Sequence, residues 1–281
     1  MRPATAFKIW AHRVLPRSLV NGVWNLSSDL KDLPTRLGAP QTPRPWRVWH
    51  NVGGGDFHLI GQQYFDWFRG ATRLQPDAHV LDMGCGAGRL AFPLSDYLDA
   101  QGVYTGFDLS ERALRFARHH VRGAAQFNFV KAEVQSREYG GAGVKATGYR
   151  FPVETNSVDA ALAISLFSHL LPEDAAAYLR EAGRVLKPGG RLCLTGFIVE
   201  PGMELGSAVL PLIAYRDGAW TADPNEPERA IGYERTVFEA WLQEAGLVLA
   251  EPVEPGHWSN PTRIGEFQDR IVVEKRPNDL S

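Results

Sequence analysis

The sequence predicts an α/β protein built around a parallel sheet. Short apolar segments alternate along the chain with longer segments whose apolar residues recur at helical spacing. Strands separated by helices pair in parallel through right-handed crossovers. One predicted strand also runs directly into the turn Gly84-Cys85-Gly86-Ala87-Gly88. Such a turn is typical of a nucleotide-like ligand bound above the carboxyl end of a strand.

Length and composition limit the class of protein. The 281 residues suffice for one large α/β domain or a domain plus an extension, and 44% hydrophobic residues allow a full core. A formal net charge of −2 gives no reason to expect nucleic acid as a partner. Cys85 and Cys193 lack metal-ligand spacing, and no acidic cluster suggests a metal. We expect two reduced cysteines in a cytoplasmic protein.

Residues 1–55 are predicted to form an N-terminal extension. No apolar run can span a bilayer, and Lys8, His12 and Arg13 interrupt any signal peptide. The basic, partly apolar residues 1–24 leave two interpretations open. One is a peripheral helix on a membrane surface, and the other is a helix packed on the domain or a lid over the active site. Residues 31–55 are expected to be irregular because four prolines interrupt them.

The remaining elements follow in order over residues 56–281. Asp56 is expected to cap a helix whose apolar side chains run from Phe57 to Phe68. Strands are predicted at about 79–82, 103–107, 127–130, 158–164 and 191–197, and helices at about 88–98 and 111–122 and from Pro172 to Lys187. A helix at 236–245 and strands at 247–253 and 268–274 end the domain. Insertions at about 135–152 and 199–232 are expected as a loop or hairpin and a cover over the site.

Glycine spacing distinguishes between nucleotide cofactors. A dinucleotide-binding turn would place its third glycine where this chain has Arg89. The spacing of Gly84, Gly86 and Gly88 instead favours S-adenosylmethionine, and a nicotinamide dehydrogenase is a disfavoured alternative. Asp108 ends the second strand, where a carboxylate suits two ribose hydroxyls.

From about Gly53 onward, the chain resembles the class I S-adenosylmethionine-dependent methyltransferases. VLDMGCGAGRL resembles their first motif, GFDLS their second, and FVKAEV their third-strand segment. Residues 157–197 resemble their fourth and fifth strand region. GGGDFHLIG, GYERTVFEAWLQEAGL, GHWS and FQDRIVVEK are similar to a bacterial branch, some of whose members are tied to glycan or cell-envelope chemistry.

The resemblance implies a Rossmann-like sheet of seven strands, one of them antiparallel, with helices on both faces. It also implies a site for S-adenosyl-L-methionine. The residues expected to bind this cofactor are Asp82, Gly84, Cys85, Gly86, Gly88, Asp108, Leu109, Ala132, Glu133 and Ser165. Asp108 would hold the ribose, Leu109 would flank the adenine, and Glu133 would meet the adenine amino group. Asp82 is expected to orient the glycine turn.

A hydroxyl acceptor would need a base to remove its proton. His169 follows the fourth strand, near the expected methyl group, and a neutral imidazole suits this task. Its alternative role is to cap or pack the next helix. The other candidates for the substrate pocket or the base are His58, Tyr64, Trp220, His257, Trp258 and Glu266.

The acceptor is predicted only as a class. Ser165-Leu166-Phe167 lacks the Asn/Asp-Pro-Pro-aromatic stretch of many enzymes that methylate amino groups of bases or glutamine. We therefore expect methyl transfer to a hydroxyl of a glycan, a glycolipid or a related small molecule. Transfer to a secondary metabolite or a carboxylate is one alternative. A non-catalytic scaffold that binds the cofactor is another. The sequence does not predict the oligomeric state.

Overall fold

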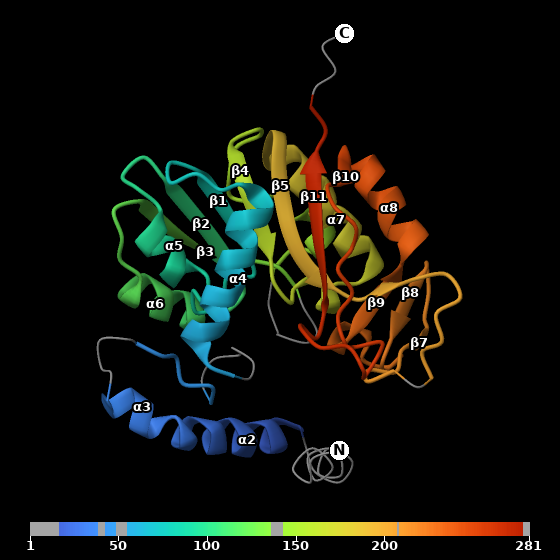
Figure 1. The fold of residues 1–281 in the computed structure, drawn as a ribbon, viewed down its shortest axis with the longest axis horizontal. Coiled ribbons are helices and arrows are strands. Elements are labelled where there is room, and N and C mark those ends of the chain that lie inside the picture. Colours follow the sequence, from blue (N-terminus) through green and yellow to red (C-terminus); the bar gives the residue numbers. More distant parts are fainter. Residues whose placement is uncertain (1–16, 39–42, 49–54, 136–142, 207, 278–281) are drawn as a thin grey trace.

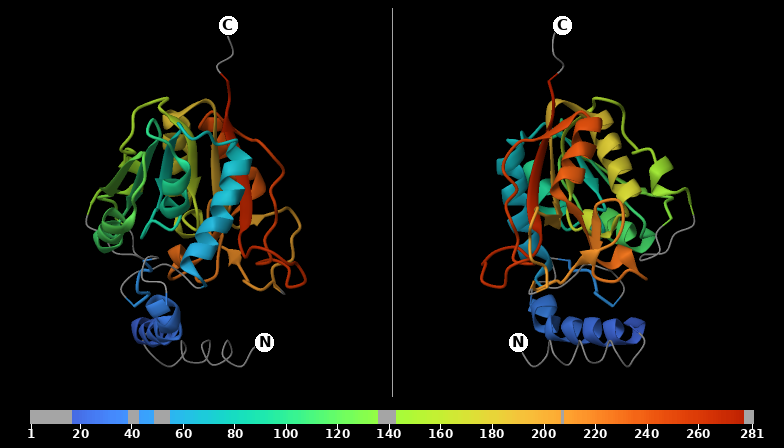
Figure 2. Two further views of the ribbon diagram at one scale, coloured as in Figure 1. Left: turned by 60° about the vertical axis from the view of Figure 1, so that its left-hand side comes forward. Right: turned by 90° about the vertical axis from the view of Figure 1, so that its right-hand side faces the viewer.

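A seven-stranded sheet organises the molecule (Figures 1 and 2). The computed structural model describes residues 17–38, 43–48, 55–135, 143–206 and 208–277. The strands are β1 (His79–Met83), β2 (Val103–Asp108), β3 (Gln126–Lys131), β4 (Val158–Ala163), β5 (Leu186–Gly196), β10 (Leu247–Leu249) and β11 (Asp269–Lys275). Their order is β10-β11-β5-β4-β1-β2-β3, and only β11 runs against its neighbours. The predicted fold class is confirmed.

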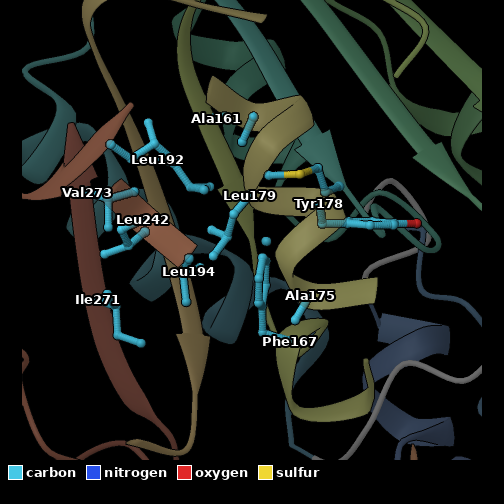
Figure 3. Close-up of a cluster of buried hydrophobic side chains, with 14 of the residues drawn as sticks. Ala161, Phe167, Ala175, Tyr178, Leu179, Leu192, Leu194, Leu242, Ile271 and Val273 are labelled. Atoms are coloured by element: carbon cyan, nitrogen blue, oxygen red, sulfur yellow. The ribbon is translucent and has the colours of Figure 1, made fainter. Parts of the chain in front are cut away.

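Helices cover both faces of the sheet because neighbouring strand residues point to opposite sides. Val80 packs with α4 (Phe57–Thr72), α5 (Ala91–Tyr97) and α6 (Glu111–His120). Leu81 packs on the other face with α7 (Pro172–Val185) and α8 (Arg235–Glu244). Figure 3 shows Leu179 of α7 and Leu242 of α8 beside Leu194 of β5 in this second cluster. The two apolar layers hold the carboxyl ends of β1, β2 and β4 at one edge.

Some predicted boundaries move by several residues. Helix α5 begins at Ala91 rather than near 88, because Gly88 has a φ of 81° and still belongs to the turn. Strand β5 begins at Leu186 rather than Arg191, since Leu186 already pairs with Val158. Strand β10 ends at Leu249 rather than near 253.

The insertion at 199–232 builds a second sheet, where a covering loop was expected. Its strands β7 (Ile213–Ala214), β8 (Ala219–Thr221) and β9 (Ile231–Glu234) join β6 (Ile198–Val199) in the order β6-β9-β8-β7. The short 3-10 helix η3 (Pro227–Arg229) precedes β9. The sequence did not predict these strands, because strands of two to four residues are too short to show an alternation of apolar and polar residues. In the other insertion, Val134 and Val144 form an isolated bridge before η1 (Ala146–Gly148), and residues 136–142 lie outside the described residues.

The N-terminal extension is more helical than the sequence indicated. It forms α2 (Arg17–Lys31) and α3 (Leu33–Gly38), whereas 31–55 was expected to be irregular. Pro34 is compatible with α3 because it lies in the first turn, where no backbone N–H is needed for an intrahelical bond. Residues 1–16 lie outside the described part, and none of the described helices is long and apolar enough to cross a membrane.

Candidate active site

A cavity of about 540 Å³ opens at the carboxyl ends of β1, β2 and β4. Its walls come from the glycine turn, the end of β2, the segment after β4, the first turns of α4 and α7, and η3 of the insertion. In an open α/β sheet, ligands bind at this edge. The insertion therefore contributes to the cavity wall through Glu228.

The glycine turn forms the floor beside β1. Gly84 and Gly86 have φ values of 74° and 53°, a region that residues with a Cβ avoid. The amides of Gly84 and Cys85 both donate to the carbonyl of Phe107, at 2.9 and 3.1 Å, which fixes the turn against β2. Gly88 lies behind the cavity wall, where a Cβ would lie 3.1 Å from Ala117 of α6. Two glycines therefore shape the floor and the third allows close helix packing.

Asp108 joins the glycine turn to the start of α6. One carboxylate oxygen accepts from the amide of Gly86 at 2.9 Å, and the other accepts from the amide of Ser110 at 2.7 Å. Burial raises the pKa of Asp108, while these hydrogen bonds oppose the shift. Each carboxylate oxygen can accept more than one hydrogen bond. Asp108 therefore keeps acceptor capacity toward the cavity.

Asp82 is a second carboxyl group at the cavity, but deeper. It accepts a hydrogen bond from the Tyr104 hydroxyl at 2.7 Å and is only 2% exposed. Burial raises the pKa of Asp82 to about 7, and the charge of Asp108 adds to the shift despite the Tyr104 hydrogen bond. A cationic ligand group beside Asp82 would favour its ionised form.

We expect Asp82→Asn to remove a pH-dependent loss of stability. The pKa of Asp82 is higher in the folded protein than its ordinary value of 3.8, so folding favours the protonated carboxyl. This stabilisation is fully present below the ordinary pKa and is lost as pH rises through the folded pKa of about 7. Between about pH 5 and about pH 8 the wild type should lose about 2 kcal/mol relative to the variant. Urea unfolding at both pH values measures this difference, and parallel pH profiles would contradict it.

His169 also lines the cavity. It ends the 3-10 helix η2 (Phe167–His169), and its Nδ1 lies 2.8 Å from the carbonyl oxygen of Glu228. A carbonyl only accepts, so Nδ1 carries the proton and Nε2 of the neutral ring is the basic nitrogen. Asp174 also lines the cavity, and burial together with the charges of Glu173 and Glu228 raises its pKa to about 6.

Most residues expected to bind the cofactor line this cavity. Those that do are Asp82, Gly84, Cys85, Gly86, Asp108, Leu109, Ala132 and Ser165, together with His169. Gly88 and Glu133 do not line it; Glu133 is exposed and pairs with Lys131 at 2.8 Å. The assignment of Glu133 to the adenine therefore stays a prediction that the cavity lining does not support.

The other pocket candidates lie elsewhere, because local partners satisfy their polar atoms. Trp258 is fully buried and donates to Asp269, and the indole of Trp220 donates to Glu234. Nε2 of His58 lies 2.9 Å from the carbonyl of Pro43. The Tyr64 hydroxyl donates to the carboxylate of Glu266, and Nδ1 of His257 contacts the backbone carbonyl of Glu266. None of these six residues is in the lining of this cavity, so their assignment to a substrate pocket stays a prediction.

Sequence reasoning missed several residues of the wall, notably Phe57, Arg89, Asp174, Tyr178 and Glu228. Arg89 is half-buried, with its guanidinium carbon 5.4 Å from the centre of the Phe57 ring. Burial lowers the pKa of Arg89, and the charge of Arg47 adds to this shift. Within the described residues no carboxylate forms an ion pair with Arg89. A half-buried cation in the wall suits an anionic group of a ligand.

The fold and the cavity define an α/β protein with a site for a nucleoside-containing ligand. Residues 81–194 match the family described as Methyltransferase domain. The chain is 34% identical over 192 residues to the ubiquinone biosynthesis O-methyltransferase of Xanthomonas oryzae pv. oryzae, covering 66% of this chain and 70% of that protein. It therefore belongs to the class I S-adenosylmethionine-dependent methyltransferases.

A further relative agrees with this family, and a solved structure agrees with the fold. The chain is 30% identical over 211 residues to the 27-O-demethylrifamycin SV methyltransferase of Amycolatopsis mediterranei, covering 70% of this chain and 64% of that protein. The chain thus spans less than two thirds of this relative, and less than half of two other curated relatives. The geranyl diphosphate C-methyltransferase of Streptomyces coelicolor A3(2) shares the fold, with a TM-score of 0.53 and 14% identity over 78% of this chain and 80% of that one.

Proposed function

We propose that this protein transfers the methyl group of S-adenosylmethionine to a hydroxyl oxygen of a small secondary-metabolite-like molecule. The observation that carries the proposal is His169, with its Nδ1 fixed by the Glu228 carbonyl, in the same cavity as the glycine turn and Asp108. The relatives named as an O-methyltransferase of ubiquinone biosynthesis and a 27-O-demethylrifamycin SV methyltransferase support oxygen as the acceptor atom.

The residues of the cavity fit the proposed cofactor. Gly86 has no atom within 4 Å of the position of a Cβ, so the backbone there is open to a ligand. Asp108 offers acceptors to ribose hydroxyls, Asp82 offers a carboxyl group to cationic groups, and Arg89 offers a cation to a carboxylate. When bound, the cofactor supplies a methyl group already activated on a sulfonium.

Residues of this chain would remove the proton of the acceptor hydroxyl and exclude water. Nε2 of His169 would take the proton of the acceptor hydroxyl as the oxygen attacks. The Glu228 carbonyl would hold the ring in this tautomer and stabilise the imidazolium that forms. The apolar side chains of Phe57, Leu166 and Leu170 in the wall would exclude water from the reacting oxygen.

The acceptor class is tested with S-adenosylmethionine carrying a labelled methyl group. Phenols, aliphatic alcohols and sugar hydroxyls are supplied in parallel, because the sequence also predicts a glycan or glycolipid acceptor. We expect labelled methyl ethers from phenols or alcohols, identified by mass spectrometry. Products labelled only at sugar hydroxyls would indicate a glycan acceptor instead of a phenol or alcohol. Products labelled at nitrogen or carbon would contradict an oxygen acceptor. Cofactor binding without any transfer would support the scaffold interpretation.

A further inference from the structure

Helices α2 and α3 expose a line of apolar side chains on the outside of the molecule. It consists of Val23, Leu26, Leu30, Leu33 and Leu37, here called the α2–α3 stripe. Their exposed fractions run from 37% to 75%. The spacing of three and four residues places Val23, Leu26 and Leu30 on one face of α2, and Leu33 and Leu37 on one face of α3.

Polar side chains on and just after α2 contact residues 47 and 48 of the chain. Asp29 is fully buried and accepts from the backbone amides of Arg47 and Val48, at 3.0 Å each. The side chain of Asn25 donates to the carbonyl of Arg47 at 3.2 Å, and Asp32 forms an ion pair with the Arg47 guanidinium. A surface helix normally buries its apolar stripe and exposes its polar face. The described side chains of α2 have the reverse arrangement, so the exposed stripe suits an apolar environment outside the chain.

The same contacts fix the stripe beside the cavity. Arg44 forms an ion pair with Asp56, the N-cap of α4. The carbonyl oxygen of Pro43 accepts a hydrogen bond from Nε2 of His58 at 2.9 Å. Phe57, between Asp56 and His58, lines the cavity. In Figures 1 and 2 the two helices lie along the edge where the parallel strands end. A surface that binds the stripe would therefore lie close to the active site.

Charge indicates what kind of surface this is. Residues 1–28 contain Arg2, Lys8, Arg13 and Arg17 and no aspartate or glutamate. The first acids of the chain, Asp29 and Asp32, are both paired with Arg47. The apolar stripe is therefore continuous in sequence with a cationic segment, and its own acids are neutralised. Apolar side chains next to cations match an anionic lipid surface, because its acyl region accommodates apolar side chains and its headgroups attract cations.

The observations favour a lipid surface over a second copy of the chain. A coiled-coil seam needs several uninterrupted heptads. Here the helix is interrupted at Asp32, between α2 and α3, and five side chains make a small contact. Two cationic N-terminal segments brought together would also repel each other.

We propose that the α2–α3 stripe docks the protein on an anionic membrane surface, with the five apolar side chains in the headgroup region. Docking would present the cavity edge of the sheet to the membrane. This inference goes beyond the proposed methyl transfer and does not depend on it.

Vesicle flotation with the full-length protein tests the inference. We expect binding to phosphatidylcholine vesicles that also contain phosphatidylglycerol, weak binding to phosphatidylcholine alone, and release by salt. The double variant Leu26→Gln/Leu30→Gln removes apolar side chains without adding charge, and should bind at least about tenfold more weakly. The matched control Ile264→Gln changes a fully exposed isoleucine outside the stripe and should bind like the wild type.

Each contrary outcome overturns the inference. Absence of wild-type binding to the anionic vesicles would mean that the stripe does not meet lipid. Equal losses in the double variant and in Ile264→Gln would show that α2 and α3 are not the docking element. A wild-type dimer that the double variant dissociates, by light scattering without vesicles, would assign the stripe to a second copy. Melting curves check that both variants are folded, and no readout uses methyl transfer.

Discussion

His169→Ala is expected to slow methyl transfer by about 10²–10⁴-fold, the usual contribution of a general base. The variant loses the basic Nε2 while the glycine turn and Asp108 keep their contacts, so cofactor affinity should change little. The rate is measured in single turnovers at saturating cofactor, and the affinity by calorimetry.

His169→Asn separates catalysis from packing. The asparagine amide can still donate to the Glu228 carbonyl, so this variant should recover stability that the alanine variant loses. It has no basic nitrogen, so its rate should stay as low as that of His169→Ala. An asparagine variant with the wild-type rate would show that His169 only holds the wall in place.

Asp108→Ala should weaken cofactor binding by about 1.5–3 kcal/mol, because hydrogen bonds to a charged acceptor contribute about that much. The substitution also leaves the amides of Gly86 and Ser110 without their acceptor, which adds to the loss. Calorimetry with S-adenosylhomocysteine measures the change without turnover.

Ser110→Ala is the matched control for Asp108. The Ser110 hydroxyl caps α6 by accepting from the amide of Ala113 at 3.3 Å, and Ser110 shares the same turn. Its loss should lower the melting temperature while cofactor affinity stays close to that of the wild type. Equal loss of affinity in the two variants would show that Asp108 acts only through the local fold.

The cofactor half of the site could be predicted because its signals are local. The glycine turn follows β1 directly, and Asp108 ends the next strand, so a parallel sheet brings both to one edge. Of the other side of the cavity, His169 was predicted from its place after β4, but its partner Glu228 was not. The contact between His169 and Glu228 joins residues 59 positions apart, and it forms because the insertion folds into a second sheet. Trp258 shows the converse, since an aromatic residue suited to a pocket is buried against Asp269.

The sequence by itself determined the α/β class, the parallel core and the place of the glycine turn at the edge of the sheet. Hydrophobic periodicity and turn chemistry act between residues close in the chain, so they can be recognised without the fold. Only the tertiary structure decided that Glu133 faces solvent, that Arg89 enters the cavity wall, and that α2 turns its apolar side outward. These outcomes depend on which residues, distant from one another in the sequence, come into contact in the fold. For α2 the buried pairing of Asp29 with residues 47 and 48 outweighed the apolar stripe, and no local pattern encodes that pairing.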